Sequence, residues 1–172
     1  MEKIKVGIVG GTGFTAGELI RILLYHPNVE ISFVTSQSLQ GEFVSDVHKD
    51  LFGETTLKFE NLAQPADMIF LCLPHGESKN WLIENEKRIA PETKIIDLGN
   101  DFRVDEEWND KKFIYGLSEF NKEKIAKASY IANPGCFATA IQLGILPILK
   151  QKKIEKIQCV GITGSTGAGK AL

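Results

Sequence analysis

The sequence predicts an α/β protein built on a doubly wound, mainly parallel sheet. An apolar strand pattern at 4–9 runs through a glycine-rich turn into a helix pattern at 16–25, and a second strand pattern follows at 29–34. These segments make one βαβ unit of the usual length. Short apolar segments then alternate with helical ones, and a βαβ crossover holds its strands parallel.

The composition indicates a globular protein of ordinary size. With 172 residues, 43% of them hydrophobic, the chain can bury a core of its own. A net charge of −2 lacks the basic excess of a nucleic-acid binder, so nucleic acid is not an expected partner. The N-terminus has no long apolar segment, so we expect neither a signal peptide nor a membrane span, and we place the protein in the cytoplasm.

After the first unit, periodicity is poor from 36 to 64, where we expect a loop-rich excursion with one short strand near 57–59. The helix at 137–149 is apolar nearly all round, so it should be buried until Pro147 ends or kinks it. The remaining predicted elements are strands at 68–73, 94–98, 130–132 and 157–162, and helices at 79–89 and 121–128.

The last predicted strand belongs to no complete unit, because the chain stops ten residues after it. We therefore expect two domains. Residues 1–149 would form an NADP-binding, Rossmann-like domain that carries the nucleophilic cysteine. Residues 150–172 would begin a mostly absent α+β domain for catalysis and dimerisation, with the segment at 157–162 as its first strand.

The first turn has the composition of a dinucleotide-binding loop. Gly7, Gly10 and Gly13 follow one another at three-residue intervals between a strand and a helix, although position 16 of the strict G-x-G-x-x-G spacing is alanine. Glycines there let the backbone approach a pyrophosphate held at the helix N-terminus. The alternative is tight packing without any nucleotide.

The second strand ends in Ser36 and Gln37 rather than in an acidic residue. A carboxylate at this position would bind the ribose 2′-hydroxyl of NAD and repel a 2′-phosphate, so its absence favours NADP. The segment Leu73-Pro74-His75 follows another strand end. His75 could touch the cofactor or act as an acid or base, or it could only form a local loop hydrogen bond.

Cys136 is the candidate nucleophile. It follows Asn133-Pro134-Gly135 at the end of a predicted strand and falls in the first turn of the apolar helix, whose N–H groups stabilise a thiolate. The alternative is a small buried hydrophobic side chain. Cys72 and Cys159 lie inside strand patterns and should be structural, and the three thiols have no spacing for a disulfide or a metal site.

Other polar residues are ambiguous. Asp97, Asp101 and Arg103 could orient a substrate or form a local salt-bridged turn, with the structural role slightly favoured. His26 and His48 stand in polar surroundings and should lie at the surface. Residues 164–170 match G-x-x-x-x-G-K, but Ala171 replaces the hydroxyl that would hold magnesium, so we expect an anion-binding loop beside Cys136 rather than a P-loop.

Together these motifs resemble the N-acetyl-gamma-glutamyl-phosphate reductase family of arginine biosynthesis, within the aspartate-semialdehyde dehydrogenase group. The resemblance runs, in order, through Gly10-Gly11-Thr12-Gly13-Phe14-Thr15, Leu73-Pro74-His75-Gly76, Asp97 to Arg103, Tyr115-Gly116-Leu117-Ser118-Glu119, Asn133-Pro134-Gly135-Cys136 and Gly164 to Lys170. Several motifs in the same order are far more specific than any one of them.

The resemblance implies an NADPH-dependent oxidoreductase. Cys136 would attack an acyl phosphate and expel phosphate, and hydride transfer to the resulting thioester would give N-acetylglutamate semialdehyde. It implies cofactor contacts from Gly10, Thr12, Gly13, Phe14, Thr15, Ser36, Gln37, Leu73, Pro74 and His75, no metal, a small-molecule substrate, and a homo-oligomer in the full-length form.

The sequence departs from the family pattern in two ways. Members are about twice as long, and their acid/base histidine lies in the part that has no counterpart here, so the 172-residue chain by itself should be inactive. Gln37 and Lys170 stand where the family has arginine. Two alternatives stay open: the homologous aminoadipyl-phosphate reductase, and an NADP-binding sensor or interaction module without catalysis.

Overall fold

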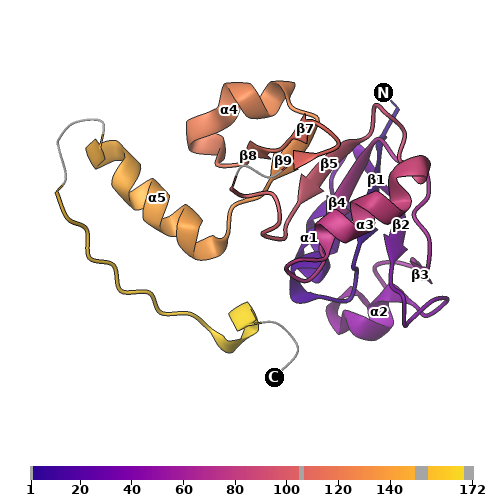
Figure 1. Ribbon diagram of the computed structural model, residues 1–172. Helices are drawn as coiled ribbons and strands as arrows, with labels where there is room; N and C mark the ends of the chain where they lie inside the picture. Colours follow the sequence, from indigo (N-terminus) through magenta and orange to yellow (C-terminus); the bar gives the residue numbers. More distant parts are fainter. Residues whose placement is uncertain (1, 105–106, 150–154, 169–172) are drawn as a thin grey trace.

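The computed structural model describes residues 2–104, 107–149 and 155–168. Its main sheet has seven strands, all parallel, in the order β3-β2-β1-β4-β5-β9-β8. The strands are β1 (Ile4–Val9), β2 (Val29–Thr35), β3 (Phe59–Glu60), β4 (Met68–Leu71), β5 (Lys94–Asp97), β8 (Ile114–Tyr115) and β9 (Tyr130–Ala132). This confirms the predicted doubly wound α/β sheet (Figure 1).

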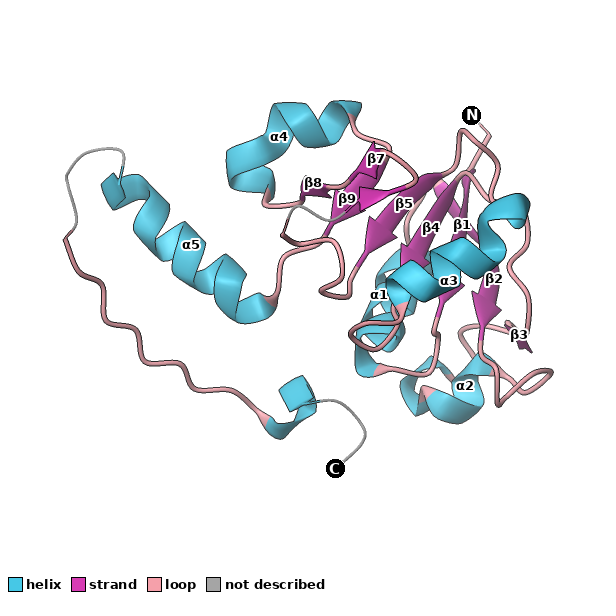
Figure 2. Ribbon diagram, viewed as in Figure 1, coloured by secondary structure: helices cyan, strands magenta, loops and turns pink. Residues whose placement is uncertain are grey.

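Helices cover the two faces of this sheet (Figure 2). The α-helices are α1 (Phe14–Leu24), α2 (Val44–Val47), α3 (Ser78–Asn85), α4 (Ser118–Lys127) and α5 (Cys136–Leu149), and the 3₁₀ turns are η1 (Lys49–Leu51), η2 (Glu86–Arg88) and η3 (Ser165–Ala168). On one face, Ile20 of α1 packs in a cluster with Val6 and Ile8 of β1. On the other, Leu82 of α3 packs in a cluster with Val9. Because side chains alternate along β1, one strand supports both layers.

Several short helices and strands were not predicted from the sequence. The loop-rich segment at 36–64 contains α2 and η1, and its expected strand is β3. Strand β8 and a hairpin of β6 (Glu107–Trp108) and β7 (Lys111–Lys112) were not expected. Asn109 and Asp110 turn that hairpin with positive φ angles of 49° and 60°. Two-residue strands are too short to carry a periodic pattern.

Helix α4 differs from its expected bounds mainly at its start, since it ends at Lys127, one residue before the expected end. It begins at Ser118, three residues earlier than expected, and Asn121 interrupts it with non-helical backbone angles (φ −112°, ψ 19°).

The prediction that the apolar helix at 137–149 is buried was wrong. Its counterpart α5 has no buried residue, and Phe137, Ile141 and Leu149 are 43%, 39% and 52% exposed. The helix also continues for two residues past Pro147 instead of ending there. Figure 1 shows α5 lying beyond α4 and β8, outside the two layers that cover the sheet. The described residues cover its apolar side chains only in part, since Phe137 lies against Gly161 while the residues of α5 stay half-buried or exposed.

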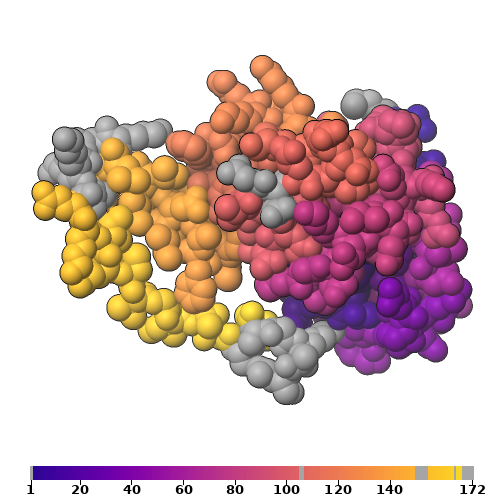
Figure 3. Space-filling model, in the orientation of Figure 1, coloured from indigo at the N-terminus to yellow at the C-terminus, as the bar shows by residue number. Residues whose placement is uncertain are grey.

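The predicted strand at 157–162 is also absent. Residues 156–164 have no regular structure, and Ile157, Val160 and Ile162 are 46%, 93% and 93% exposed. A strand needs a neighbour for its N–H and C=O groups, and none of the described segments pairs with this one. Figure 3 shows the segment at the rim of the molecule beside α5. The expected domain start near Lys150 lies outside the described residues.

No helix in the described ranges is both long enough and apolar enough to cross a membrane.

Candidate functional site

A cleft of about 720 Å³ lies at the carboxyl ends of β1, β2 and β4. Strands β1 and β4 are neighbours, and their connections leave toward opposite halves of the sheet. In open α/β sheets this reversal of strand order is where ligands bind. The lining residues are Val9, Gly10, Thr12, Thr35, Ser36, Gln37, Ser38, Asn61, Leu73, Pro74, Glu77, Asn80, Trp81, Ile83 and Glu84.

Six of the ten predicted cofactor residues line this cleft together, although they come from three separate turns. They are Gly10, Thr12, Ser36, Gln37, Leu73 and Pro74. Gly13, Phe14 and Thr15 continue the first turn into α1 but do not line the cleft. His75 follows Pro74, but its side chain is exposed and does not line the cleft either.

The turn between β1 and α1 needs its glycines for two different reasons. Gly10 has a φ of +80°, and a Cβ there would lie 2.6 Å from the Cys72 carbonyl oxygen just after β4. A Cβ on Gly11 would lie 2.2 Å from Val34. These two glycines therefore pack the turn against the sheet, whereas a Cβ on Gly13 would meet nothing within 4 Å.

The beginning of α1 suits an anion. Gly13 is the N-cap residue, no side chain caps the helix there, and its first turn contains no acidic residue. Backbone N–H groups at such an end attract negative charge through the helix dipole. The expected pyrophosphate site is thus chemically consistent with the turn that forms it.

The end of β2 supplies neutral polar groups. The Gly10 N–H donates to the Thr35 hydroxyl over 3.4 Å, and the Ser36 N–H donates to the Glu60 carbonyl over 2.9 Å. Thr35, Ser36, Gln37 and Ser38 all line the cleft and carry no charge. The lining carboxylates, Glu77 and Glu84, come from the segment around α3 instead.

Helix α3 provides a wall of the cleft that was not predicted from the sequence. Glu77, Asn80, Trp81 and Glu84 stand at positions i, i+3, i+4 and i+7, so they share one helix face. That spacing is visible in the sequence. What the sequence did not reveal is that this face turns toward the cleft while Leu82 enters the core.

The prediction that His48 lies at the surface was wrong. Its side chain is only 7% exposed, and its Nε2 lies 2.7 Å from the Gly11 carbonyl oxygen. Polar neighbours in sequence suggested solvent, but α2 and η1 fold this segment back against α1 and the glycine turn. No sequence pattern marks this contact.

Cys136 is the first residue of α5, and its side chain is exposed. The Thr139 N–H donates to the Gly135 carbonyl over 2.8 Å, which starts the helix directly behind the cysteine. This confirms the predicted position at a helix N-terminus and excludes the buried alternative. Since β9 is parallel to β1 and β4, Cys136 follows the same edge of the sheet as the cleft.

Arg103 holds the turn that precedes Cys136. Its Nε donates to the Asn133 carbonyl over 2.9 Å and its Nη2 to the Leu98 carbonyl over 3.0 Å. A Cβ on Gly135 would lie 3.0 Å from Arg103 Nη1, so the guanidinium lies directly against this turn. The Asn133 N–H also donates to the Asp97 carbonyl over 2.8 Å.

The two aspartates of the same motif bind the loop and helix that follow β4. Asp97 is buried, and its Oδ1 accepts from the Ser78 hydroxyl over 2.6 Å and from the Gly99 N–H over 3.0 Å. Burial raises the pKa of Asp97, with the nearby Asp101 charge as a lesser cause. Asp101 accepts from the N–H groups of Gly76 and Lys79 over 2.7 and 3.1 Å.

Among the described residues, Asp97, Asp101 and Arg103 form no ion pair with one another. Instead, Asp97 accepts from the Ser78 hydroxyl and the Gly99 N–H, while Asp101 and Arg103 bind backbone groups of neighbouring segments. The motif therefore has the structural role that the sequence favoured, but it does not form the expected salt-bridged turn. The motif links the loop after β4, the start of α3 and the turn before Cys136.

All three cysteines are free thiols, but they differ in environment. Burial raises the pKa of the half-buried Cys72 to about 12, with a smaller contribution from the Asp97 charge. Cys159 was expected inside a strand as a structural residue, and this was wrong: it is exposed because the strand does not form. In the described ranges no cluster of three or more His, Cys, Asp and Glu side chains is arranged to hold a metal ion.

The glycine-rich segment after the absent strand is described only as far as Ala168. It forms the 3₁₀ turn η3, in which the Gly167 N–H donates to the Gly164 carbonyl over 3.1 Å. Lys170, the cation of the expected anion-binding loop, lies outside the described residues.

Two family models match the chain. The model described as the semialdehyde dehydrogenase NAD-binding domain matches residues 5–128. The model described as the semialdehyde dehydrogenase dimerisation domain matches residues 136–172, beginning at Cys136.

Curated relatives are similar over almost the whole chain. The N-acetyl-gamma-glutamyl-phosphate reductase of Flavobacterium johnsoniae is 52% identical over 173 residues, which cover 98% of this chain and 53% of the relative. The enzyme of the same name from Christiangramia forsetii is 48% identical, with coverage of 98% and 52%. The chain therefore spans about half the length of the curated relatives it matches.

Solved structures support the fold. Aspartate semialdehyde dehydrogenase II from Vibrio cholerae superposes with a TM-score of 0.72 at 21% identity and covers 99% of this chain and 49% of its own. Aspartate semialdehyde dehydrogenase from Candida albicans, solved with NADP, superposes with a TM-score of 0.59 at 15% identity and covers 87% of this chain and 48% of its own. At these identities the likeness concerns the fold.

Proposed function

The chain belongs to the semialdehyde dehydrogenase family through its NAD-binding domain, and we propose that it is the cofactor-binding half of an NADPH-dependent N-acetyl-gamma-glutamyl-phosphate reductase. One observation carries the proposal: relatives of that name are 52% and 48% identical over 98% of the chain. The cleft at the switch point of the sheet and the exposed cysteine at the same sheet edge supply the two parts that such a reaction needs.

NADP(H) would lie in the cleft. Gly10, Thr12 and Gly13 would hold the pyrophosphate at the start of α1, followed by Phe14 and Thr15 in its first turn. Leu73 and Pro74 would flank the nicotinamide end, with His75 at its outer rim. The open space beside Gly13 supports this arrangement, because a backbone without side-chain cover admits a phosphate group.

The preference for NADP over NAD rests on the end of β2. A ribose 2′-phosphate would meet Ser36 and Gln37, whose hydroxyl and amide can donate hydrogen bonds without opposing its charge. The two lining carboxylates come from a different wall of the cleft. An acidic residue at the end of β2 would favour NAD instead.

Cys136 would act as the nucleophile. Its sulfur is exposed at the first residue of α5, which is 14 residues long, and as a thiolate it would attack the acyl carbon of the substrate. A carbon–sulfur bond forms, and the carbon–oxygen bond to phosphate breaks with its electron pair leaving on phosphate. NADPH, when bound, supplies a hydride to the thioester. Collapse of the thiohemiacetal then restores the thiolate and releases the semialdehyde.

The acid/base group that handles the proton of the thiohemiacetal would come from the half of the enzyme beyond this chain, so the chain alone should bind cofactor without turnover. The substrate would be a small acyl phosphate. The match of residues 136–172 to a dimerisation-domain model supports a homo-oligomer in the full-length form.

The test uses the chain joined to the carboxyl-terminal half of the Flavobacterium johnsoniae relative. We expect phosphate-dependent oxidation of N-acetylglutamate semialdehyde, a loss of at least about a thousandfold in Cys136→Ala, and unchanged NADPH binding in that variant. NADPH binding without Cys136-dependent oxidation would instead make the chain a cofactor sensor. A faster reaction with the one-methylene-longer aminoadipate semialdehyde would reassign the substrate.

A further inference from the structure

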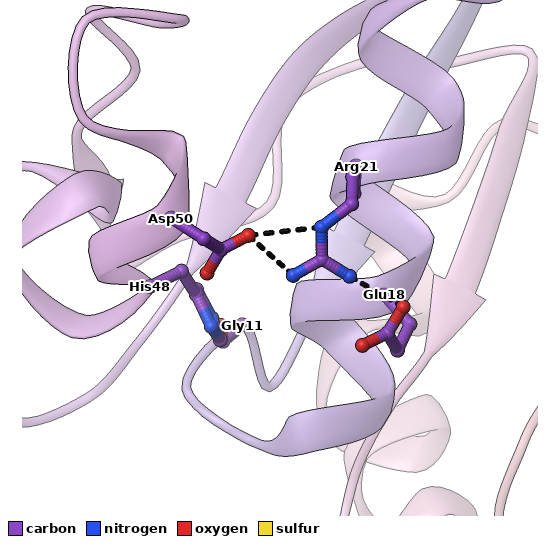
Figure 4. A network of polar contacts seen from close by, with 5 residues as sticks. All are labelled: Gly11, Glu18, Arg21, His48 and Asp50. Carbon is purple, nitrogen blue, oxygen red and sulfur yellow. Dashed lines mark hydrogen bonds and ion pairs between the residues drawn. The ribbon is translucent and has the colours of Figure 1, made fainter.

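His48, which follows α2, points toward Gly11 in the turn between β1 and α1 (Figure 4). Its Nε2 is 2.7 Å from the Gly11 carbonyl oxygen, and the contact is buried. Since a carbonyl can only accept, the imidazole donates its Nε2–H. The His48 backbone is fixed as well, because its N–H donates to the Val44 carbonyl and its carbonyl accepts from the Leu51 N–H.

The ring also lies against α1. A Cβ on Gly17 would come within 2.5 Å of His48 Nδ1, so the ring fits only because position 17 is glycine. Two residues further on, Asp50 pairs with Arg21 of α1, and Arg21 also pairs with Glu18 (Figure 4). The segment that carries His48 is thus attached to α1 at two places, and the imidazole has little freedom to move.

These contacts fix the peptide that joins Gly11 to Thr12. The Gly11 N–H donates to the Thr35 carbonyl over 2.8 Å, while the Gly11 carbonyl accepts from His48. In a planar trans peptide the C=O of one residue and the N–H of the next point in opposite directions, and the described chain has no cis peptide. The Thr12 N–H therefore points away from the imidazole. Thr12 itself lines the cleft.

We propose that His48 is a positioning residue for the cofactor pyrophosphate. By holding the Gly11 carbonyl, it keeps the partial negative charge of that oxygen away from the cleft and presents the Thr12 N–H in its place. A reversed peptide would turn the oxygen toward the bound phosphates and repel them. This inference rests on the proposed function, because it requires a dinucleotide in the cleft.

The test compares two substitutions of similar size. In His48→Gln the side-chain amide can still donate to Gly11, whereas His48→Met fills the space without a donor. We expect the Kd for NADPH, measured by quenching of intrinsic fluorescence, to rise about tenfold in His48→Met and less than about threefold in His48→Gln, since one hydrogen bond separates them. His26→Gln, on an exposed loop, is the matched control and should leave the Kd unchanged.

Binding of a second ligand distinguishes a specific loss of pyrophosphate binding from a general loosening of the fold. Adenosine 2′-monophosphate lacks the pyrophosphate, so its Kd should be the same in all four proteins. Equal weakening of NADPH binding by both His48 variants, no weakening in either, or a parallel loss of adenosine 2′-monophosphate would overturn the inference. Failure of the unaltered chain to bind NADPH would instead overturn the proposed function, and the inference with it.

A measurement without any variant keeps the inference testable if His48→Met does not fold. Inorganic pyrophosphate added to the unaltered chain should shift the Thr12 amide resonance in a ¹H–¹⁵N correlation spectrum. An unshifted Thr12 amide at a pyrophosphate concentration that shifts the other amides of the turn would contradict the proposed orientation.

Discussion

Individual side chains hold the backbone at the carboxyl edge of the sheet. His48 binds the glycine turn, Arg103 binds the turn before Cys136, and Asp101 binds the loop that leads into α3. Each side chain makes a hydrogen bond to a backbone group that lies beyond the strand ends and is not paired within the sheet. This arrangement keeps the cleft and the cysteine turn in fixed positions while leaving Cys136 itself exposed.

The three thiols should differ in their rates of alkylation. We expect iodoacetamide at pH 8 to modify Cys136 first, because it is exposed at a helix N-terminus, and Cys159 second, because it is exposed without such a helix. Cys72 should be modified last, since a pKa of about 12 leaves almost no thiolate at this pH.

Peptide mass spectrometry over a time course measures the three rates, with Cys159→Ser as the control that removes the other exposed thiol. A Cys136 rate no greater than that of Cys159 would show that the helix does not activate the thiol.

Asp97 should make the free energy of unfolding depend on pH. Burial raises its pKa in the folded state, so the folded chain binds this proton more tightly than the unfolded chain does. The stabilisation is therefore complete below the unfolded pKa of about 4 and is lost as the pH rises through the folded pKa.

Asp97→Asn keeps an oxygen for Ser78 and Gly99 but cannot ionise. The melting temperature of this variant minus that of the unaltered chain should increase from pH 4 to pH 7, as measured by circular dichroism. A difference that stays flat or falls with pH would contradict the assignment.

The turn between β1 and α1 combines packing and binding in neighbouring glycines. Gly10 and Gly11 face the sheet, where a Cβ would overlap Cys72 just after β4 or Val34 of β2, whereas Gly13 faces open space with an ordinary φ of −75°. The same element can therefore be tested separately for stability and for cofactor binding.

Gly11→Ala should lower the free energy of unfolding by about 1–3 kcal/mol, because the new methyl group overlaps Val34. Gly13→Ala should lower it by less than about 1 kcal/mol, since only the N-cap preference is lost. Gly13→Ala should nevertheless weaken NADPH binding by about tenfold, because its methyl group occupies the space assigned to the pyrophosphate.

Urea unfolding and NADPH titration of the two variants measure these effects. Unchanged NADPH affinity in Gly13→Ala would place the cofactor elsewhere.

In the molecule as a whole, a compact sheet with its two helical layers contrasts with α5 and the segment at 155–168. The core clusters are built from residues up to Ala132, and no residue of α5 is buried. Figure 3 shows the orange and yellow segments along one side of this body. Resistance to unfolding should therefore be unequal along the chain.

Limited proteolysis measures that inequality. Trypsin should cleave first after Lys156, in an exposed segment without regular structure, and the fragment that contains β1 to β9 should persist. Intact-mass analysis of the products identifies the site, and Lys156→Gln should delay this first cut. A first cut between β1 and β9 would contradict the prediction. NADPH should slow any later cleavage within 2–132 without protecting Lys156.

The sequence by itself determined the parallel sheet, the glycine turn and the place of Cys136 at a helix start. Each depends on local signals: apolar runs of strand length, glycines between a strand and a helix, and Pro134 and Gly135 before an apolar helix. It also identified the three turns that contribute to the cleft, because parallel strands bring their carboxyl ends to one edge.

Only the tertiary structure decided the burial of individual residues and the partners of distant ones. His48 is buried because residues 36–64 fold onto α1, and no local pattern encodes a contact across 37 residues with Gly11. The predictions for the apolar helix α5 and for a strand at 157–162 were wrong in the opposite direction, because these segments were expected to be buried or paired and are largely exposed. Hydrophobicity shows that a segment can be buried, but burial and strand pairing require neighbours. In the described chain α5 is covered only in part, and no segment pairs with residues 157–162.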